Sequence, residues 1–142
     1  MSLRGEVIEP DTKFRLMELL MELDVPIYAP KPKRRVVYIN YVGNKVEVMY
    51  EDGTKNVYPP RRFSLRKYVA EVRDLETDLK ARLLQMLIDF GATVKTVTGK
   101  KIVEVSVDGE WARLCHEYPN NTRRCSIYRL ESFAKRPYLV EL

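Results

Sequence analysis

Alternating apolar and polar residues mark three consecutive strands in the first half of the chain. We expect them at residues 36–42, 45–51 and 54–58, joined by two-residue turns at Gly43-Asn44 and Asp52-Gly53. Turn length sets the register, and a slip of one residue moves every later side chain to the opposite face. The expected register gives a core face of Val37, Ile39, Tyr41, Val46, Val48, Tyr50 and Val57. The outer face then carries Tyr38, Asn40, Lys45, Glu47, Met49, Asn56 and Tyr58.

Apolar residues at helical spacing lie before and after these strands. A first helix is expected to begin at an N-cap, Asp11, and to run to about residue 24. A long second helix is expected over residues 65–90, capped by Ser64 and ended by Gly91. Its heptad positions are Leu65, Val72, Leu79 and Met86. A parallel apolar series breaks at Arg82, which favours packing on the sheet over dimerisation as the role of this stripe.

The second half of the chain shows the same alternation. A short strand is expected at residues 93–97, before three further strands at 102–107, 110–118 and 123–130. Asp108-Gly109 forms a turn within this set. A last helix is expected near Pro137.

Matching residues recur in the same order in the two halves. Lys13 aligns with Lys80, and the basic pair Arg34-Arg35 aligns with Lys100-Lys101. Tyr50 aligns with His116, and a spaced set recurs as Tyr58, Phe63, Arg66, Tyr68 and then Tyr128, Phe133, Arg136, Tyr138. We therefore predict one compact α+β domain over residues 1–142, made of repeats at about 11–72 and 78–142. Each repeat is a helix plus a three- or four-stranded antiparallel meander, and the long central helix is shared.

Cys115 and Cys125 are the only cysteines, and His116 is the only histidine. The register of the first repeat, applied to the second, places the two cysteines on opposite faces of the sheet. A disulfide between them would need a slip of one residue, so we expect free thiols. Two cysteines and one histidine are too few for a typical four-ligand zinc site, and no metal or other cofactor is expected.

Positive charge is concentrated in the two segments rich in strands. Residues 25–70 carry ten basic and three acidic side chains, and residues 91–136 carry nine and five. This segregation favours a surface that binds a polyanion. The abundance of charged residues also suggests a thermophile. The sequence has no apolar run long enough to span a membrane and no apolar stretch of a signal peptide, so we expect a cytoplasmic protein.

The sequence gives little support to catalysis. His116 aligns with a core position, and Glu104 is expected to form a cross-strand ion pair with Arg113. No nucleotide-binding loop, nucleophile elbow or metal-ligand spacing is present. We therefore expect a binding protein rather than an enzyme.

Aromatic residues beside arginines and lysines suit single-stranded nucleic acid, because bases stack on rings and cations bind phosphates. The second repeat is expected to expose Glu104, Ser106, Trp111, Arg113, Cys115, Ser126 and Tyr128 on its outer face. The predicted nucleic-acid-binding residues are Tyr38, Tyr58, Trp111, Tyr128, Arg34, Arg35, Arg61, Arg62, Arg113, Arg124, Lys100 and Lys101. The partner would be single-stranded DNA or RNA, bound without strong sequence specificity. The alternative is a protein-interaction or assembly module that forms a homodimer through the long helix or the outer face.

In element order, residues 26–69 and 93–139 resemble the PUR, whirly and PC4-like single-strand-binding proteins. The resemblance implies paired sheet-plus-helix units that bind nucleic acid through the sheet. The basic, thermophile-like composition is also similar to that of the archaeal single-stranded DNA-binding proteins called ThermoDBP.

Overall fold

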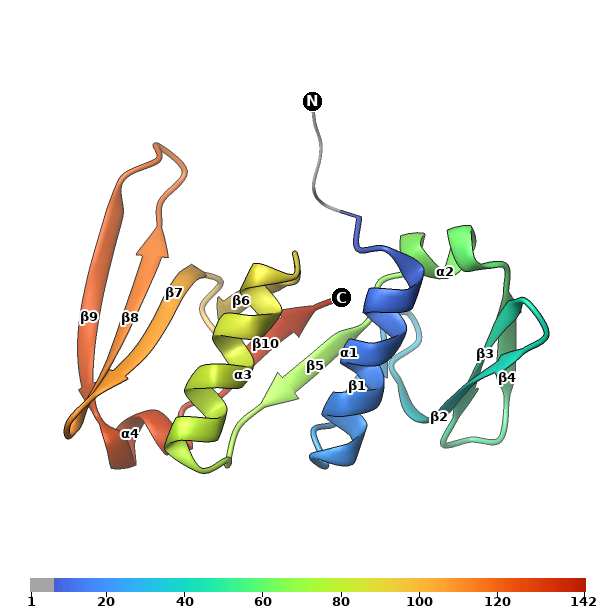
Figure 1. Cartoon of the computed structure of the whole chain (residues 1–142), viewed down its shortest axis with the longest axis horizontal. Helices are drawn as coiled ribbons and strands as arrows, with labels where there is room; N and C mark the ends of the chain where they lie inside the picture. Colours follow the sequence, from blue (N-terminus) through green and yellow to red (C-terminus); the bar gives the residue numbers. More distant parts are fainter. Residues whose placement is uncertain (1–6) are drawn as a thin grey trace. The chain divides into compact units, whose positions relative to one another are not determined.

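A computed structural model describes residues 7–142, which divide into two units (Figure 1). Unit 1 contains the residues up to Ala70 together with Glu141–Leu142, and unit 2 contains Glu71–Val140. The described residues form an α+β fold with four helices and a ten-stranded antiparallel sheet. The strand order in the sheet is β4-β3-β2-β1-β5-β10-β6-β7-β8-β9.

The first half of the chain forms seven elements, of which the first six lie in unit 1 and the seventh continues into unit 2. They are α1 (Pro10–Glu22), β1 (Ile27–Ala29), β2 (Arg34–Val42), β3 (Lys45–Tyr50), β4 (Lys55–Tyr58), α2 (Pro60–Leu65) and β5 (Val69–Val72). Helix α1 packs its apolar stripe, which includes Met17 and Leu20, against the sheet face that carries Ile39. Phe63 of α2 is fully buried, so both helices cover the same core.

The second half forms seven elements in the same order. They are α3 (Thr77–Asp89), β6 (Thr93–Thr96), β7 (Lys101–Asp108), β8 (Trp111–Glu117), β9 (Arg123–Arg129), α4 (Leu130–Lys135) and β10 (Tyr138–Glu141). In unit 2, α3 packs against β7, where the Gln85 carboxamide accepts a hydrogen bond of 2.8 Å from the Val105 amide. Leu84, Leu87 and Leu114 lie in this core. No helix among residues 7–142 is long and apolar enough to cross a membrane.

The long helix expected over residues 65–90 does not form. Strand β5 forms instead, and its side chains alternate between partly exposed and buried. Helix α3 begins after Glu76, whose carboxylate caps it by accepting hydrogen bonds from the Asp78 and Leu79 amides. The predicted heptad positions therefore do not lie along one face of a single helix. Leu65 is 67% exposed, and Val72 is buried in a strand. The predicted last helix near Pro137 is also wrong, because α4 ends at Lys135 and β10 follows.

The turn between β3 and β4 contains three residues rather than two. The Tyr50 amide donates to the Thr54 carbonyl, and the Asp52 carboxylate accepts hydrogen bonds from the Thr54 amide and hydroxyl. Gly53 adopts a positive φ of 87°, which suits the last position of such a turn. The extra residue moves Tyr58 to the core face opposite Val46 and Val57 to the outer face, so the predicted faces of β4 are reversed.

The same change occurs between β8 and β9. The Tyr118 amide donates to the Thr122 carbonyl, and the Asn120 side chain accepts from the Thr122 amide and hydroxyl. Asn121 takes the positive φ, 67°. The resulting slip places Cys115 directly opposite Cys125, and the two form a disulfide. The expectation of free thiols is therefore wrong, because the slip that a disulfide requires is present.

A register shift in the β2–β3 pair explains a further exchange of faces. Tyr38 is opposite Met49, but Val36 is opposite Tyr50, so Val37 is an extra residue in β2. Val36 is 3% exposed and Val37 is 46% exposed, whereas the alternation predicted Val37 for the core. The β7–β8 pair has a shift of the same kind between Ile102 and Glu104.

Candidate nucleic-acid interface

An aromatic and a cationic side chain face each other on the outer face of unit 2. Trp111 of β8 pairs with Arg129 of β9, and the guanidinium carbon lies 5.2 Å from the centre of the indole ring. Trp111 is 44% exposed, and Ile127, one pair along the same face, is 63% exposed. A large apolar side chain left this open on a sheet is available to a ligand.

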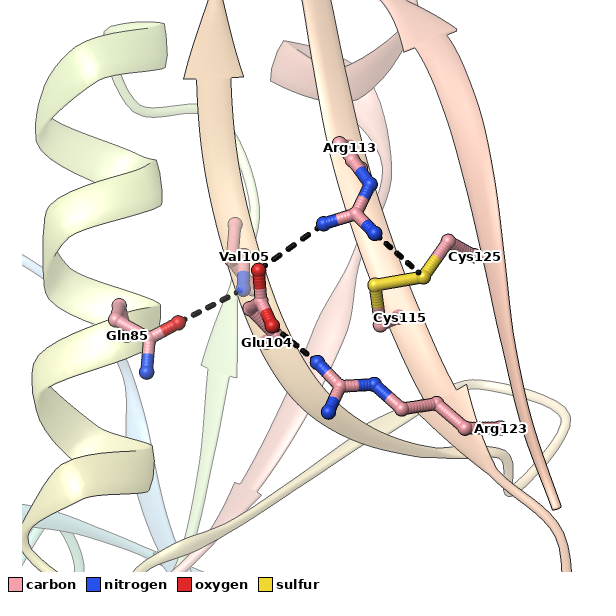
Figure 2. Close-up of a disulfide and its surroundings, with 7 residues drawn as sticks. All are labelled: Gln85, Glu104, Val105, Arg113, Cys115, Arg123 and Cys125. Atoms are coloured by element: carbon pink, nitrogen blue, oxygen red, sulfur yellow. Dashed lines mark hydrogen bonds and ion pairs between the residues drawn. A yellow bond between two sulfur atoms is a disulfide. The ribbon is translucent and has the colours of Figure 1, made fainter.

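Two more arginines extend this face toward the disulfide (Figure 2). Arg113 donates to Glu104 over 3.0 Å and to the sulfur of Cys125 over 3.2 Å. Arg123 forms an ion pair with the other oxygen of Glu104. The expected pair of Glu104 with Arg113 is confirmed. One carboxylate thus holds two guanidinium groups and leaves one positive charge in excess.

We define the Trp111 face as Trp111, Arg113, Arg123, Ile127 and Arg129. Only Trp111 and Arg113 were among the residues predicted from the sequence. The others were missed because they depend on the register of β9, which the three-residue turn shifts by one position. The sequence does contain a signal for that turn. Asn120 lies two residues before Thr122, as Asp52 lies two residues before Thr54.

The outer face of unit 1 also carries an exposed aromatic side chain. Tyr38 is exposed there, and Val57, Lys45 and Lys55 share the same face. Lys55 forms a salt bridge of 3.5 Å with Glu47. This face therefore offers the ring of Tyr38 and two flexible amines, and Arg35, which pairs with Tyr28 of β1, adds an exposed guanidinium group.

The other two predicted stacking residues lie on the core faces of their units. Tyr58 packs beneath the guanidinium of Arg66 at 5.1 Å, and Tyr128 packs beneath that of Arg136 at 4.2 Å. Both tyrosines are half-buried. The prediction that Tyr58 and Tyr128 share a face with Tyr38 and Trp111 is wrong, for the register reason given above.

The remaining predicted cations come from several elements of the two units. Arg34 stacks 3.9 Å over the buried ring of Tyr50 and donates to the Thr54 hydroxyl. Arg124 pairs with His116 in the register, which places it on the face opposite Trp111. The other predicted cations are exposed: Arg35 in β2, Arg61 and Arg62 in α2, and Lys100 and Lys101 at the start of β7. Within unit 2, the predicted cations Arg113 and Arg124 therefore lie on opposite faces of the sheet.

Residues 7–142 contain no group of three or more His, Cys, Asp or Glu side chains placed to hold a metal ion. Burial, together with the charges of Lys100 and Arg124, lowers the pKa of His116. Its Nε2 atom lies 3.2 Å from the Tyr118 hydroxyl.

No protein-family model, curated protein or solved structure matches this chain.

Proposed function

We propose that this protein binds single-stranded DNA or RNA, with the Trp111 face as the principal contact surface. The observation that carries the proposal is the exposed indole of Trp111 beside Arg129, with Arg113 and Arg123 on the same face. The indole offers a platform for a base, and the guanidinium groups offer contacts to phosphates. Each base has a flat face, so such binding tolerates sequence differences.

Charge would add to stacking and make the binding sensitive to salt. Each cation that neutralises a phosphate releases counterions, so affinity falls as the salt concentration rises. Arg129 would serve both purposes, since its guanidinium lies over the indole and can also reach a backbone phosphate. In unit 1, Tyr38 offers a second stacking position of the same kind.

The test is the affinity of a labelled single strand, followed by fluorescence anisotropy and by quenching of Trp111. Replacing Trp111 by Ala removes one stacking platform and should weaken binding roughly 5- to 150-fold, which corresponds to about 1–3 kcal/mol per base. Arg129→Gln should reduce the slope of log affinity against log salt by about one.

Arg82→Gln is the matched control for Arg129→Gln. Arg82 is an exposed arginine of α3, the helix that packs on the opposite side of β7 in the same unit. The Arg82→Gln substitution should leave both the affinity and the salt slope close to those of the unaltered protein. Absence of binding at low salt, or equal affinity of the Trp111→Ala variant, would overturn the proposal. A salt-insensitive oligomer that buries Trp111 and Ile127 would instead support the protein-interaction alternative.

We also propose that the two halves of the chain arose by duplication of one unit, as in the paired-sheet architecture of the PUR and whirly proteins. The order of elements agrees from α1 to β5 and from α3 to β10. The shifted pairs Val36–Tyr50 and Ile102–His116 hold aligned positions, and both three-residue turns use an Asx side chain to bind a threonine. Unrelated stretches would have little reason to share a bulge at aligned positions followed by a turn of the same kind.

A further inference from the structure

Unit 2 contains a cavity of about 300 Å³ on the core side of its sheet. It lies next to β6, β7, β8 and β9 and is closed by the segment that follows α4. The larger side chains of its lining are those of Ile102, Leu114, Tyr128, Arg136, Pro137 and Tyr138. The volume is at the lower end of the range found for small-molecule sites. Trp111 is not part of it, because Trp111 points to the other face.

The aligned place in unit 1 is filled by side chains. Tyr50 is buried there, and the Arg34 guanidinium lies 3.9 Å from its ring. The Tyr50 hydroxyl is 3.5 Å from that of Tyr68, so each phenol has a polar neighbour. Unit 2 has His116 at the position of Tyr50 and Lys100 at that of Arg34. The imidazole is smaller than a phenol and packs edge-on against Tyr118, which leaves the space open.

The exchange also deprives one buried hydroxyl of its partner. Tyr138, the counterpart of Tyr68, lines the cavity and is 1% exposed, and its hydroxyl has no hydrogen-bond partner. Burial raises the pKa of Tyr138 to about 12, against the charge and the side-chain contact of the neighbouring Arg136, whose guanidinium lies near this hydroxyl without meeting hydrogen-bond geometry. An orphaned buried hydroxyl is unfavourable, and a bound ligand would satisfy it.

The lining indicates the chemistry of such a ligand. Lys100 and Arg136 contribute positive charge, and none of the described lining residues is acidic. Tyr128 and Pro137 supply apolar surface, while Thr98 and Ser126 add hydroxyls. These features fit a planar ring that carries polar edge atoms and an anionic substituent.

We propose that this cavity binds one nucleotide, with the base against Tyr128 and within reach of the Tyr138 hydroxyl, and the phosphate near Lys100 and Arg136. The choice of a nucleotide among planar anions rests on the proposed nucleic-acid function. The nucleotide can be a free mononucleotide or one residue of a bound strand, and both present the same base and phosphate.

The only histidine of the chain makes a direct probe of this cavity. The imidazole resonances of His116 can be followed by NMR while adenosine or cytidine 5′-monophosphate, or an unlabelled single strand, is added. We expect a mononucleotide to shift these resonances. A shift with the strand as well would identify a strand residue as an occupant, whereas a shift with mononucleotides alone would identify free nucleotides. No shift with either would overturn the proposal.

Two variants test the cavity directly: one fills it with the side chains of unit 1, and the other removes only one hydroxyl from its lining. Lys100→Arg with His116→Tyr keeps the formal charge and restores the residues of unit 1, so it should abolish mononucleotide binding in calorimetry. Tyr138→Phe keeps the ring and removes only the orphaned hydroxyl, so it should weaken binding roughly three- to tenfold. Mononucleotide affinities in these two variants equal to that of the unaltered protein would overturn the proposal.

Quenching of Trp111 by the strand reports separately on the proposed function. If mononucleotides shift His116 but no strand binds, the cavity proposal stands for free nucleotides and the Trp111 face is wrong. If the strand quenches Trp111 while His116 stays unchanged with both ligands, the proposed function stands and the cavity proposal fails.

Discussion

Two buried lysines show how single residues organise this fold. Lys80 of α3 is fully buried, and its ammonium donates to the carbonyls of Phe133, Ala134 and Arg136 at 2.8, 3.1 and 2.5 Å. Lys13 of α1 makes the corresponding contacts with the carbonyls of Ser64 and Arg66. The last carbonyls of a helix lack intrahelical partners and favour a nearby cation. Each lysine therefore joins a long helix to the end of a short one.

Replacing Lys80 by Met should lower the free energy of unfolding by about 3 kcal/mol, because it leaves buried carbonyls without a donor. Chemical denaturation would measure the change. Lys135→Met is the control: Lys135 is an exposed residue of α4, so its loss should change stability by no more than about 0.5 kcal/mol. Equal stability of the two variants would show that the hydrogen bonds of the Lys80 ammonium do not stabilise the fold.

The same lysines predict a dependence of stability on pH. Burial lowers the pKa of Lys13 and of Lys80 to about 8, whereas an unfolded lysine titrates near 10.4. Between these values the unfolded chain binds more protons than the folded one, so the free energy of unfolding should rise from about pH 8 to pH 10. Denaturation at several pH values would measure it. Lys13→Met or Lys80→Met alone should reduce the rise, and an unchanged rise would contradict the assignment.

At the scale of elements, the sequence predicted where strands lie better than which way they face. The expected strand at residues 36–42 corresponds to β2, and that at 93–97 to β6, because alternation is a local property. Faces failed at Val37, which is itself the extra residue of a bulge, and at Tyr58 and Tyr128, which each follow a three-residue turn. One extra residue reverses every later side chain, and the alternation itself does not reveal it.

The disulfide predicts how firmly β8 and β9 are joined. It closes a loop with a sequence separation of ten residues, and in the chain-entropy account such a link contributes about 3 kcal/mol. The double variant Cys115→Ala with Cys125→Ala should lose this amount in chemical denaturation. Reductant should lower the stability of the unaltered protein similarly and leave the variant unaffected. Equal stability of the oxidised and reduced protein would contradict the prediction.

The break between α2 and β5 gives a further prediction. Leu65 is exposed at the end of α2, so Leu65→Glu should change the free energy of unfolding by no more than about 0.5 kcal/mol. Leu83 is buried in α3, and Leu83→Glu should be strongly destabilising in the same thermal or chemical denaturation experiment. A severe loss from Leu65→Glu would instead indicate the continuous helix that the heptad spacing suggested.

At the scale of the whole molecule, composition and alternation were sufficient for the α+β class. They were insufficient for the candidate site, because a site depends on which side chains share a face. Trp111 was identified because its expected side did not depend on the β8–β9 turn, whereas Arg129 and Ile127 were lost by the slip. The cavity was also beyond the sequence, since it depends on how much space His116 leaves.

The lone tryptophan has a consequence for how unfolding can be observed. Trp111 lies in unit 2, and unit 1 contains no tryptophan. Indole emission therefore reports the melting of unit 2 alone, while far-ultraviolet circular dichroism averages over both units. If the two signals give the same midpoint, the chain melts as one cooperative system. If the midpoints differ, their separation measures how far one half can lose its structure while the other keeps it.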